Sequence, residues 1–306
     1  MELALITVKQ VVVLFILIFA GFVCVKTKAV KMEGKKAFSD LLLYLIVPAM
    51  VINSYMMECN AEILQNLLKA FGLSILLLFI GLLVTMVLTA KHKSPDLPIM
   101  RFACIFSNAA YMGFPLIQAL FGSEGLLYAS AFVTVYNILL WTAGYGIVSK
   151  KVRAKEVWRT IFTNPVLISV AAGLLIYLCQ IPVPDIIKQP ISLIGNMNTP
   201  LSMFITGMII AGSDIKGLVY NKNIWYIILV RQLVIPAVCF GVFSLFHVTG
   251  MAAQVVLLLE VCPSAAITSV FAVQFQYDEN LAAGAVVITT FLSILTLPVC
   301  AMLLTV

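Results

Sequence analysis

Apolar segments of about 20 residues follow one another along almost the whole chain, and this feature constrains the fold most. A helix needs about 20 apolar residues to cross a bilayer. Ten such segments can be placed, over residues 3–25, 37–57, 63–90, 98–121, 125–149, 158–180, 188–212, 222–246, 251–275 and 280–304. Hydrophobic residues make up 62% of the chain and charged residues only 10%, which excludes an ordinary soluble domain. The sequence therefore predicts an all-α integral membrane protein with ten transmembrane helices.

Lysine and arginine are distributed unevenly among the loops. The four loops before segments 37–57, 98–121, 158–180 and 222–246 carry fifteen of these residues, whereas the loops on the other side carry only Lys188. Because basic loops stay in the cytoplasm, we expect these four loops on the cytoplasmic side of the plasma membrane and both termini outside. The formal charge of +6 thus reports topology and gives no evidence for a nucleic-acid partner.

Ten helices with both termini on one side divide into two halves of five, residues 1–149 and 150–306. An odd number of helices per half forces the halves into opposite orientations, which is the inverted repeat of many transporters. Residues 20–21 (Ala-Gly) match residues 172–173, and Pro48 matches Pro200 at the same offset; residues 121–124 also resemble residues 275–278. The sequence predicts an inverted repeat.

Two segments contain polar or helix-breaking residues at the depth of the bilayer centre. The fourth segment reads SNAAYMGFP over residues 107–115, with Gly113 and Pro115, and the ninth reads EVCPS over residues 260–264. Such a break is tolerated at membrane depth only where protein or a water-filled cavity surrounds the backbone. Interrupted helices at corresponding places in two halves indicate a transporter's binding site. We therefore expect two broken helices with a solute site beside them.

A glutamate within the ninth segment is expensive to bury, at about 2.5–3.5 kcal/mol for an ionised side chain. Glu260 is either a ligand for a cation or proton, or a protonated or structurally paired residue. Oxygen donors of Ser107, Asn108, Ser130, Thr134 and Glu260 could together hold Na⁺. Hydroxyls spaced i, i+4, as at positions 130 and 134, alternatively tie membrane helices together by hydrogen bonds.

Arg231 is the other deep charge, and three interpretations remain open for it. It could pair with Glu260, act as a countercharge for an anionic substrate, or extend to the cytoplasmic interface along its apolar stem. Amides at membrane depth could bind substrate or join helices; they belong to Asn53, Asn137, Asn196 and Asn198.

Motifs of soluble catalysis and nucleotide binding do not occur: there is no Walker A lysine motif, GxGxxG, HExxH or GxSxG. No cofactor is expected, and we predict that the protein is not an enzyme. An intramembrane enzyme that uses Glu260 as acid or base, and a channel, are the alternatives from other classes.

Residues 107–116 (SNAAYMGFPL), 271–277 (FAVQFQY) and 295–298 (LTLP) resemble the auxin efflux carrier family, which includes the plant PIN exporters and bacterial relatives. The resemblance covers essentially the whole chain. It implies a scaffold of helices 1, 2, 6 and 7 and a transport domain of helices 3–5 and 8–10, with helices 4 and 9 crossing at their breaks. It also implies a substrate site formed by Asn108, Pro263, Ser264 and Ile267, faced by Val51 and Asn196 from the scaffold.

The chain departs from the plant members at three places. Ser107 stands where they have a proline, Glu260 stands where they are apolar, and the loop between helices 5 and 6 has only about ten residues. The sequence EVCPS over residues 260–264, together with residues 107–108, 130 and 134, also resembles the sodium sites of the bile acid:sodium symporter family, which shares the fold. Bacterial relatives of the auxin carriers include malate and malonate transporters. The resemblance thus implies secondary transport of a small organic anion, coupled to Na⁺ or H⁺, and a homodimer through the scaffold; a bile-acid-type symporter is the alternative.

Overall fold

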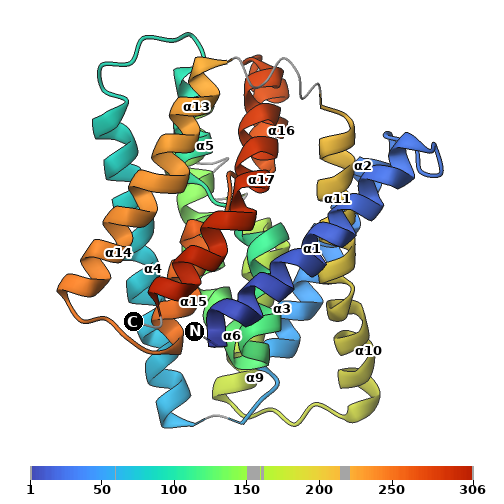
Figure 1. Cartoon of the computed structure of the whole chain (residues 1–306). Coiled ribbons are helices and arrows are strands. Elements are labelled where there is room, and N and C mark those ends of the chain that lie inside the picture. The colour runs from blue at the N-terminus through green and yellow to red at the C-terminus, as the bar shows by residue number, and fades with distance from the viewer. Residues whose placement is uncertain (1, 59, 150–158, 160–161, 214–220, 305–306) are drawn as a thin grey trace.

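A bundle of helices makes up all the regular structure that the computed structural model describes, over residues 2–58, 60–149, 159, 162–213 and 221–304 (Figure 1). The first half contains α1 (Glu2–Lys26), α2 (Gly34–Leu41), η1 (Leu42–Ile46), α3 (Val47–Tyr55), α4 (Ala61–Leu88), α5 (Leu97–Ile105), η2 (Ala109–Gly113), α6 (Phe114–Leu139), η3 (Leu140–Gly144) and α7 (Tyr145–Ser149). The second half contains α9 (Pro165–Leu178), α10 (Asp185–Asn196), α11 (Asn198–Ala211), α13 (Lys222–Ile228), η4 (Leu229–Val234), α14 (Ile235–Leu245), α15 (Met251–Val261), α16 (Ile267–Phe275) and α17 (Glu279–Leu303). The η elements are π-helical turns within longer helices.

Within the described residues, seven helical stretches are long and apolar enough to cross a membrane: Ile6–Lys26, Gly34–Tyr55, Ala61–Leu88, Ala109–Ser149, Asp185–Ala211, Lys222–Leu245 and Glu279–Leu303. Two shorter helices, Pro165–Leu178 and Met251–Val261, are also apolar. The all-helical, multi-pass membrane architecture is therefore confirmed. Ten separate crossings stay a prediction. To reach ten, the stretch Ala109–Ser149 must be two spans that meet near Gly122, which has a φ of 60°. A further predicted span begins at residue 158, which lies outside the described residues.

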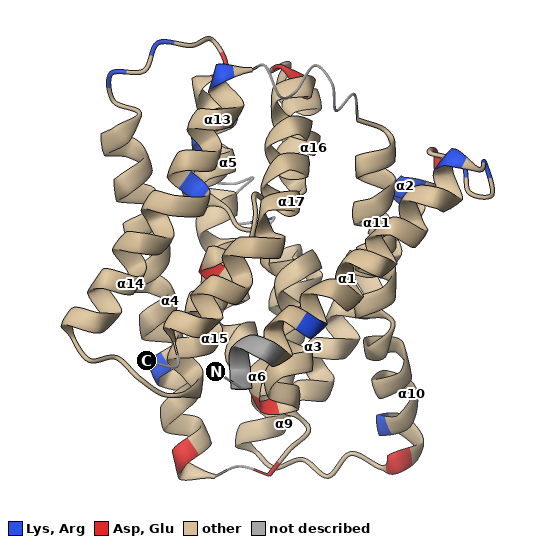
Figure 2. Cartoon of the chain, viewed as in Figure 1, with Lys and Arg blue, Asp and Glu red and all other residues tan. Residues whose placement is uncertain are grey.

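The ends of the bundle differ in charge. Both termini lie toward the end that also holds the connection from α9 to α10, and the loops after α1 and α4 lie at the opposite end (Figure 1). Most of the ribbon positions of lysine and arginine lie toward that opposite end (Figure 2). The basic residues predicted for the other two loops fall largely outside the described part of the chain, namely Lys150, Lys151, Arg153, Lys155 and Lys216.

Two glycines at matching repeat positions permit close helix contacts. In α1, a Cβ at Gly21 would lie 2.8 Å from Phe204 Cα on α11; in α9, a Cβ at Gly173 would lie 2.5 Å from Tyr55 Cδ2 on α3. Small residues at helix interfaces in membranes allow such approach. The pairing of helix 1 with helix 7 and of helix 6 with helix 2 is the relation that an inverted repeat requires. This supports the division at residue 150, which stays a prediction.

Candidate functional site

The fourth and ninth helices are broken, as predicted, and their breaks lie against each other. α5 ends at Ile105 and α15 at Val261, and extended residues follow both. The Asn108 N–H donates to the Pro263 carbonyl at 2.7 Å, and the Ala265 N–H donates to the Phe106 carbonyl at 2.9 Å. Ser107 and Ser264 form the antiparallel bridge between these bonds. The two breaks thus pair some of each other's backbone N–H and C=O groups, and protein supplies the hydrogen bonds that lipid cannot.

Local chemistry explains where each helix breaks. Pro263 has no N–H and disfavours the helical conformation of the residue before it, and Cys262 accordingly has a ψ of 153°. The first break has no proline at its start. A Cβ at Gly113 would lie 2.5 Å from Leu259 Cδ2 and 3.4 Å from Cys262 Sγ, so glycine is what lets the ninth helix approach. Pro115 is the second residue of α6, directly after the π-helical turn η2, and it donates no backbone hydrogen bond to that turn.

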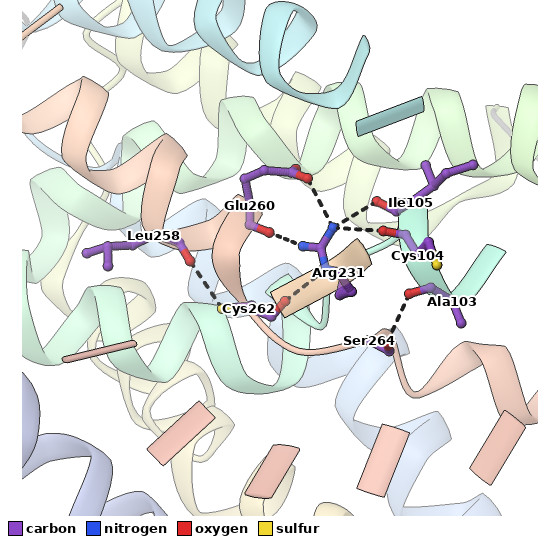
Figure 3. A network of polar contacts seen from close by, with 8 residues as sticks. All are labelled: Ala103, Cys104, Ile105, Arg231, Leu258, Glu260, Cys262 and Ser264. Atoms are coloured by element: carbon purple, nitrogen blue, oxygen red, sulfur yellow. Dashed lines mark hydrogen bonds and ion pairs between the residues drawn. The ribbon is translucent and has the colours of Figure 1, made fainter. Parts of the chain in front are cut away.

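A buried guanidinium lies where the first halves of both broken helices end (Figure 3). Arg231 Nε donates to the Cys262 carbonyl at 3.1 Å, and Nη1 donates to the carbonyls of Cys104 and Ile105, each at 3.2 Å. Nη2 donates to the Glu260 carbonyl. Nη1 also pairs with Glu260 Oε1 at 3.0 Å, and both side chains have 0% exposed area. One group therefore contacts the carbonyl ends of two helices and a carboxylate.

This arrangement decides among the three interpretations of Arg231. Pairing with Glu260 is what the structure shows. Extension to the cytoplasmic interface is wrong, because the guanidinium is fully buried and its three nitrogens are held by carbonyls at the crossover. Arg231 lies on the π-helical turn η4, a type of irregularity that is frequent at functional sites.

A second polar chain joins the crossover to the last helix. Gln232 donates through Nε2 to the Thr289 carbonyl at 3.3 Å and accepts at Oε1 from Thr296 at 2.9 Å. The Thr289 hydroxyl accepts from the Ser264 N–H at 3.0 Å, and the Ser264 hydroxyl donates to the Ala103 carbonyl at 2.9 Å. Sequence reasoning missed Gln232 and Thr289; polar side chains inside apolar segments were the signal for them.

Several buried polar atoms around the breaks have no hydrogen-bond partner among the described residues. They are Ser107 Oγ, Asn108 Nδ2, Glu260 Oε2, Thr268 Oγ1 and Ser269 Oγ. Buried polar atoms normally have partners, so unsatisfied ones call for an explanation such as a ligand or water. Of the predicted substrate residues, the structure brings together Asn108, Pro263, Ser264 and Ile267, the last at the start of α16.

The helix 5 hydroxyls are bonded within protein. The Ser130 hydroxyl donates to the Leu127 carbonyl at 2.6 Å and contacts Tyr55 Oη at 2.6 Å, and Thr134 donates to the Ser130 carbonyl at 2.7 Å. This is the helix-joining arrangement that was the alternative to a cation site. Asn137 donates to the Val133 carbonyl and accepts from Asn164, so its amide also joins segments.

The predicted scaffold residues lie in different surroundings. Val51 is buried in α3. Asn196, at the exposed end of α10, accepts from Gln118 Nε2 of α6 at 3.2 Å. Asn198 is fully buried at the start of α11, and neither its Oδ1 nor its Nδ2 has a partner within the described chain. Asn53 lines a cavity of about 520 Å³ together with Ser123, Asp185, Lys188 and Gln189.

Comparisons with known proteins agree with this architecture. A model of the family described as membrane transport protein matches residues 6–301. An uncharacterized transporter of Methanocaldococcus jannaschii is 24% identical over 305 residues, covering 96% of this chain and 97% of that protein. An uncharacterized transporter of Methanothermobacter thermautotrophicus is 23% identical over 201 residues, or 65% of each chain.

Proposed function

The chain belongs to the membrane transport protein family, and we propose that within this family it is a secondary carrier of a small organic anion. The resemblance to the auxin efflux carriers is thereby confirmed at the level of the family. The observation that carries the proposal is the set of unpartnered polar side chains at the crossover. A substrate with one or two carboxylates, of the size of malate or malonate, matches their chemistry.

Apart from Glu260 Oε2, the unpartnered groups can donate hydrogen bonds of the kind an anion needs. The Asn108 amide supplies N–H groups, and Ser107, Thr268 and Ser269 supply hydroxyls, which donate to carboxylate oxygens. The second half of the fourth helix begins after Asn108 and that of the ninth at Ile267. The N-terminal end of a helix carries partial positive charge and favours an anion. Donors and helix ends thus favour the same sign of charge in the substrate.

Alternating access would move the predicted transport domain against the predicted scaffold. Hydrogen bonds between described residues join these groups of helices in the present conformation, among them Tyr55 with Ser130, Gln118 with Asn196, and Asn164 with Asn137. Asn198 offers an unpartnered amide from the scaffold side, on α11, which packs against η2. In this proposal Asn108 binds the substrate carboxylate, Asn198 and Val51 face it, and the joining bonds break during each cycle.

For the driving ion, sequence reasoning left Na⁺ and H⁺ open. A Na⁺ ion on Glu260 Oε1 would compete with Arg231, which holds that oxygen at 3.0 Å, whereas Oε2 has no partner in the described chain. We therefore retain a proton at Glu260 as the coupling ion in this proposal. The plasma-membrane location with outer termini and the homodimer through the scaffold belong to the same proposal.

The test begins with a ligand screen on the purified protein. Thermal shifts with dicarboxylates, indole acids and bile acids, each with and without Na⁺, should identify a carboxylate that stabilises the protein. Uptake of that compound into proteoliposomes should then saturate with concentration. Asn108→Ala should weaken its binding about tenfold, the value of one charge-assisted hydrogen bond. The matched control is Asn137→Ala, since the Asn137 amide already has protein partners in the Val133 carbonyl and the Asn164 amide.

Other outcomes would refute the proposal. Full substrate affinity in Asn108→Ala would remove the binding role of the crossover. Conductance without saturation would identify a channel, and turnover of a lipid or peptide would identify an enzyme. Bile acid binding that requires Na⁺ would favour the symporter alternative.

A further inference from the structure

Five oxygen atoms converge on one point at the crossover, and all come from the first halves of the broken helices. Four are the carbonyls of Cys104, Ile105, Glu260 and Cys262, and the fifth is the Glu260 Oε1. The C-terminal end of each helix carries about half a negative charge. Two such ends and a carboxylate make a fully buried position that strongly favours a cation. Carbonyl and carboxylate oxygens are also the ligands that hard metal cations take in proteins.

The residues present do not fit a Na⁺ ion at this position. Every one of the five oxygens accepts from Arg231, whose Nε, Nη1 and Nη2 are all engaged. The hydroxyls of Ser130 and Thr134, which the sequence-based hypothesis placed in a sodium site, donate to the carbonyls of Leu127 and Ser130 on their own helix. The sodium ion of the sequence-based hypothesis and the guanidinium would require the same oxygens.

We propose that Arg231 is a tethered cation that permanently fills a cation site built from the two broken helices. The native protein then binds no alkali cation there, and removal of the guanidinium opens a site for a small free cation. Because most of these oxygens belong to the backbone, they remain when Arg231 is replaced. Where the proposed function holds, a further consequence follows: the cation is never released during the cycle, so transport needs no Na⁺ gradient.

The first measurement uses the purified full-length protein in detergent and the variant Arg231→Ala. We expect the thermal midpoint of Arg231→Ala to be well below that of the native protein. Low-millimolar guanidinium should raise it in a saturable manner, and Na⁺ should do so to a smaller extent. Urea, the neutral analogue of guanidinium, and choline at equal ionic strength should not. The native midpoint should not respond to guanidinium at these concentrations.

Two further variants separate this site from a merely structural arginine. Arg101→Ala is the matched control, because within the described residues the Arg101 guanidinium donates to Thr89 alone, to its hydroxyl at 2.8 Å and to its carbonyl at 3.5 Å. Guanidinium should not restore that variant. Adding Glu260→Gln to Arg231→Ala should weaken the guanidinium response, because one of the five oxygens loses its charge.

Binding of radioactive Na⁺ to the native protein tests whether the site is already filled by Arg231, even where Arg231→Ala does not fold. No saturable binding is expected. Saturable Na⁺ binding that Glu260→Gln abolishes would overturn the proposal, as would an Arg231→Ala midpoint that responds equally to guanidinium and urea. None of these measurements uses the transported solute, so their failure would leave the proposed function standing, and the failure of that function would not affect them.

Discussion

The contacts of Arg231 predict an asymmetric double-mutant cycle with Glu260. Arg231→Met removes the donor to four backbone carbonyls and the partner of one carboxylate. A buried acceptor left unsatisfied costs about 1–3 kcal/mol, so four of them predict a loss of roughly 4 kcal/mol or more. Every 1.4 kcal/mol is tenfold, and the unfolding equilibrium should shift by roughly a thousandfold.

Glu260→Gln should cost less, because the side chain makes only the bond from Oε1 to Arg231, and Oε2 has no partner in the described chain. A hydrogen bond to a charged group contributes about 1.5–3 kcal/mol, and the glutamine oxygen can still accept. The double variant Arg231→Met/Glu260→Gln avoids an unpaired carboxylate but still leaves the four carbonyls bare. It should therefore stay close to Arg231→Met in stability.

The cycle is measured by unfolding in mixed micelles of detergent and SDS, followed by circular dichroism. Isolated buried ion pairs can often be replaced by apolar residues at little cost or even a gain. Near-native stability in the double variant would show that Arg231 and Glu260 are such an isolated pair. That result would refute the conclusion that the guanidinium satisfies the ends of the broken helices.

Two further predictions concern contacts away from Arg231. Tyr55→Phe and Ser130→Ala each remove the 2.6 Å hydrogen bond between α3 and α6. If that bond must break in each cycle, both variants should raise the initial transport rate roughly 2- to 10-fold, because such a bond contributes about 0.5–1.5 kcal/mol. Unchanged transport rates in both variants would contradict this prediction. Gly113→Ala places a Cβ 2.5 Å from Leu259 Cδ2 and should cost about 1–3 kcal/mol of stability through overpacking, with Leu259→Ala restoring part of it. The matched control is Gly72→Ala, whose Cβ meets nothing within 4 Å and which should be neutral or stabilising because alanine favours a helix; equal losses at both glycines would contradict the close approach at Gly113.

The helices and both breaks could be predicted because their causes are local. Hydropathy determines where a helix enters and leaves the bilayer. The segment predicted over residues 63–90 is therefore observed as the helix Ala61–Leu88, and the segment predicted over residues 280–304 as Glu279–Leu303. Pro263 lacks an N–H and disfavours the helical conformation of Cys262, although Pro298 lies inside the continuous helix α17, so proline alone favours a break without requiring one. For the same reason, the polarity of Asn108 and Glu260 within apolar segments could be recognised from the sequence, whereas their contacts could not.

The partners of Arg231 could not be predicted, because four of its five acceptor oxygens are backbone carbonyls. Every residue has a carbonyl, so positions 104, 105, 260 and 262 carry no sequence signature for this role. Only the antiparallel meeting of residues 107 and 264 brings the two helix ends within reach of one side chain. Sequence reasoning therefore found Glu260 and Arg231 and kept their pairing as one of three interpretations, because a long apolar stem also permits extension to the interface.

Fixing a cation at one pair of helix ends also decides what the other pair can do. Each broken helix contributes a C-terminal end and an N-terminal end to the crossover. The single charge of Arg231 offsets the two C-terminal ends, which carry about half a negative charge each. When Glu260 holds the proposed proton, the field that remains comes from the two N-terminal ends, beside the unpartnered groups of Asn108 and Thr268. Without the guanidinium, the negative ends and Glu260 would oppose an incoming carboxylate, because opposite dipole ends and charges largely cancel at short range. In the proposed function, Arg231 would therefore favour an anionic substrate without touching it, and Arg231→Ala restored by guanidinium should regain affinity for the carboxylate together with its stability.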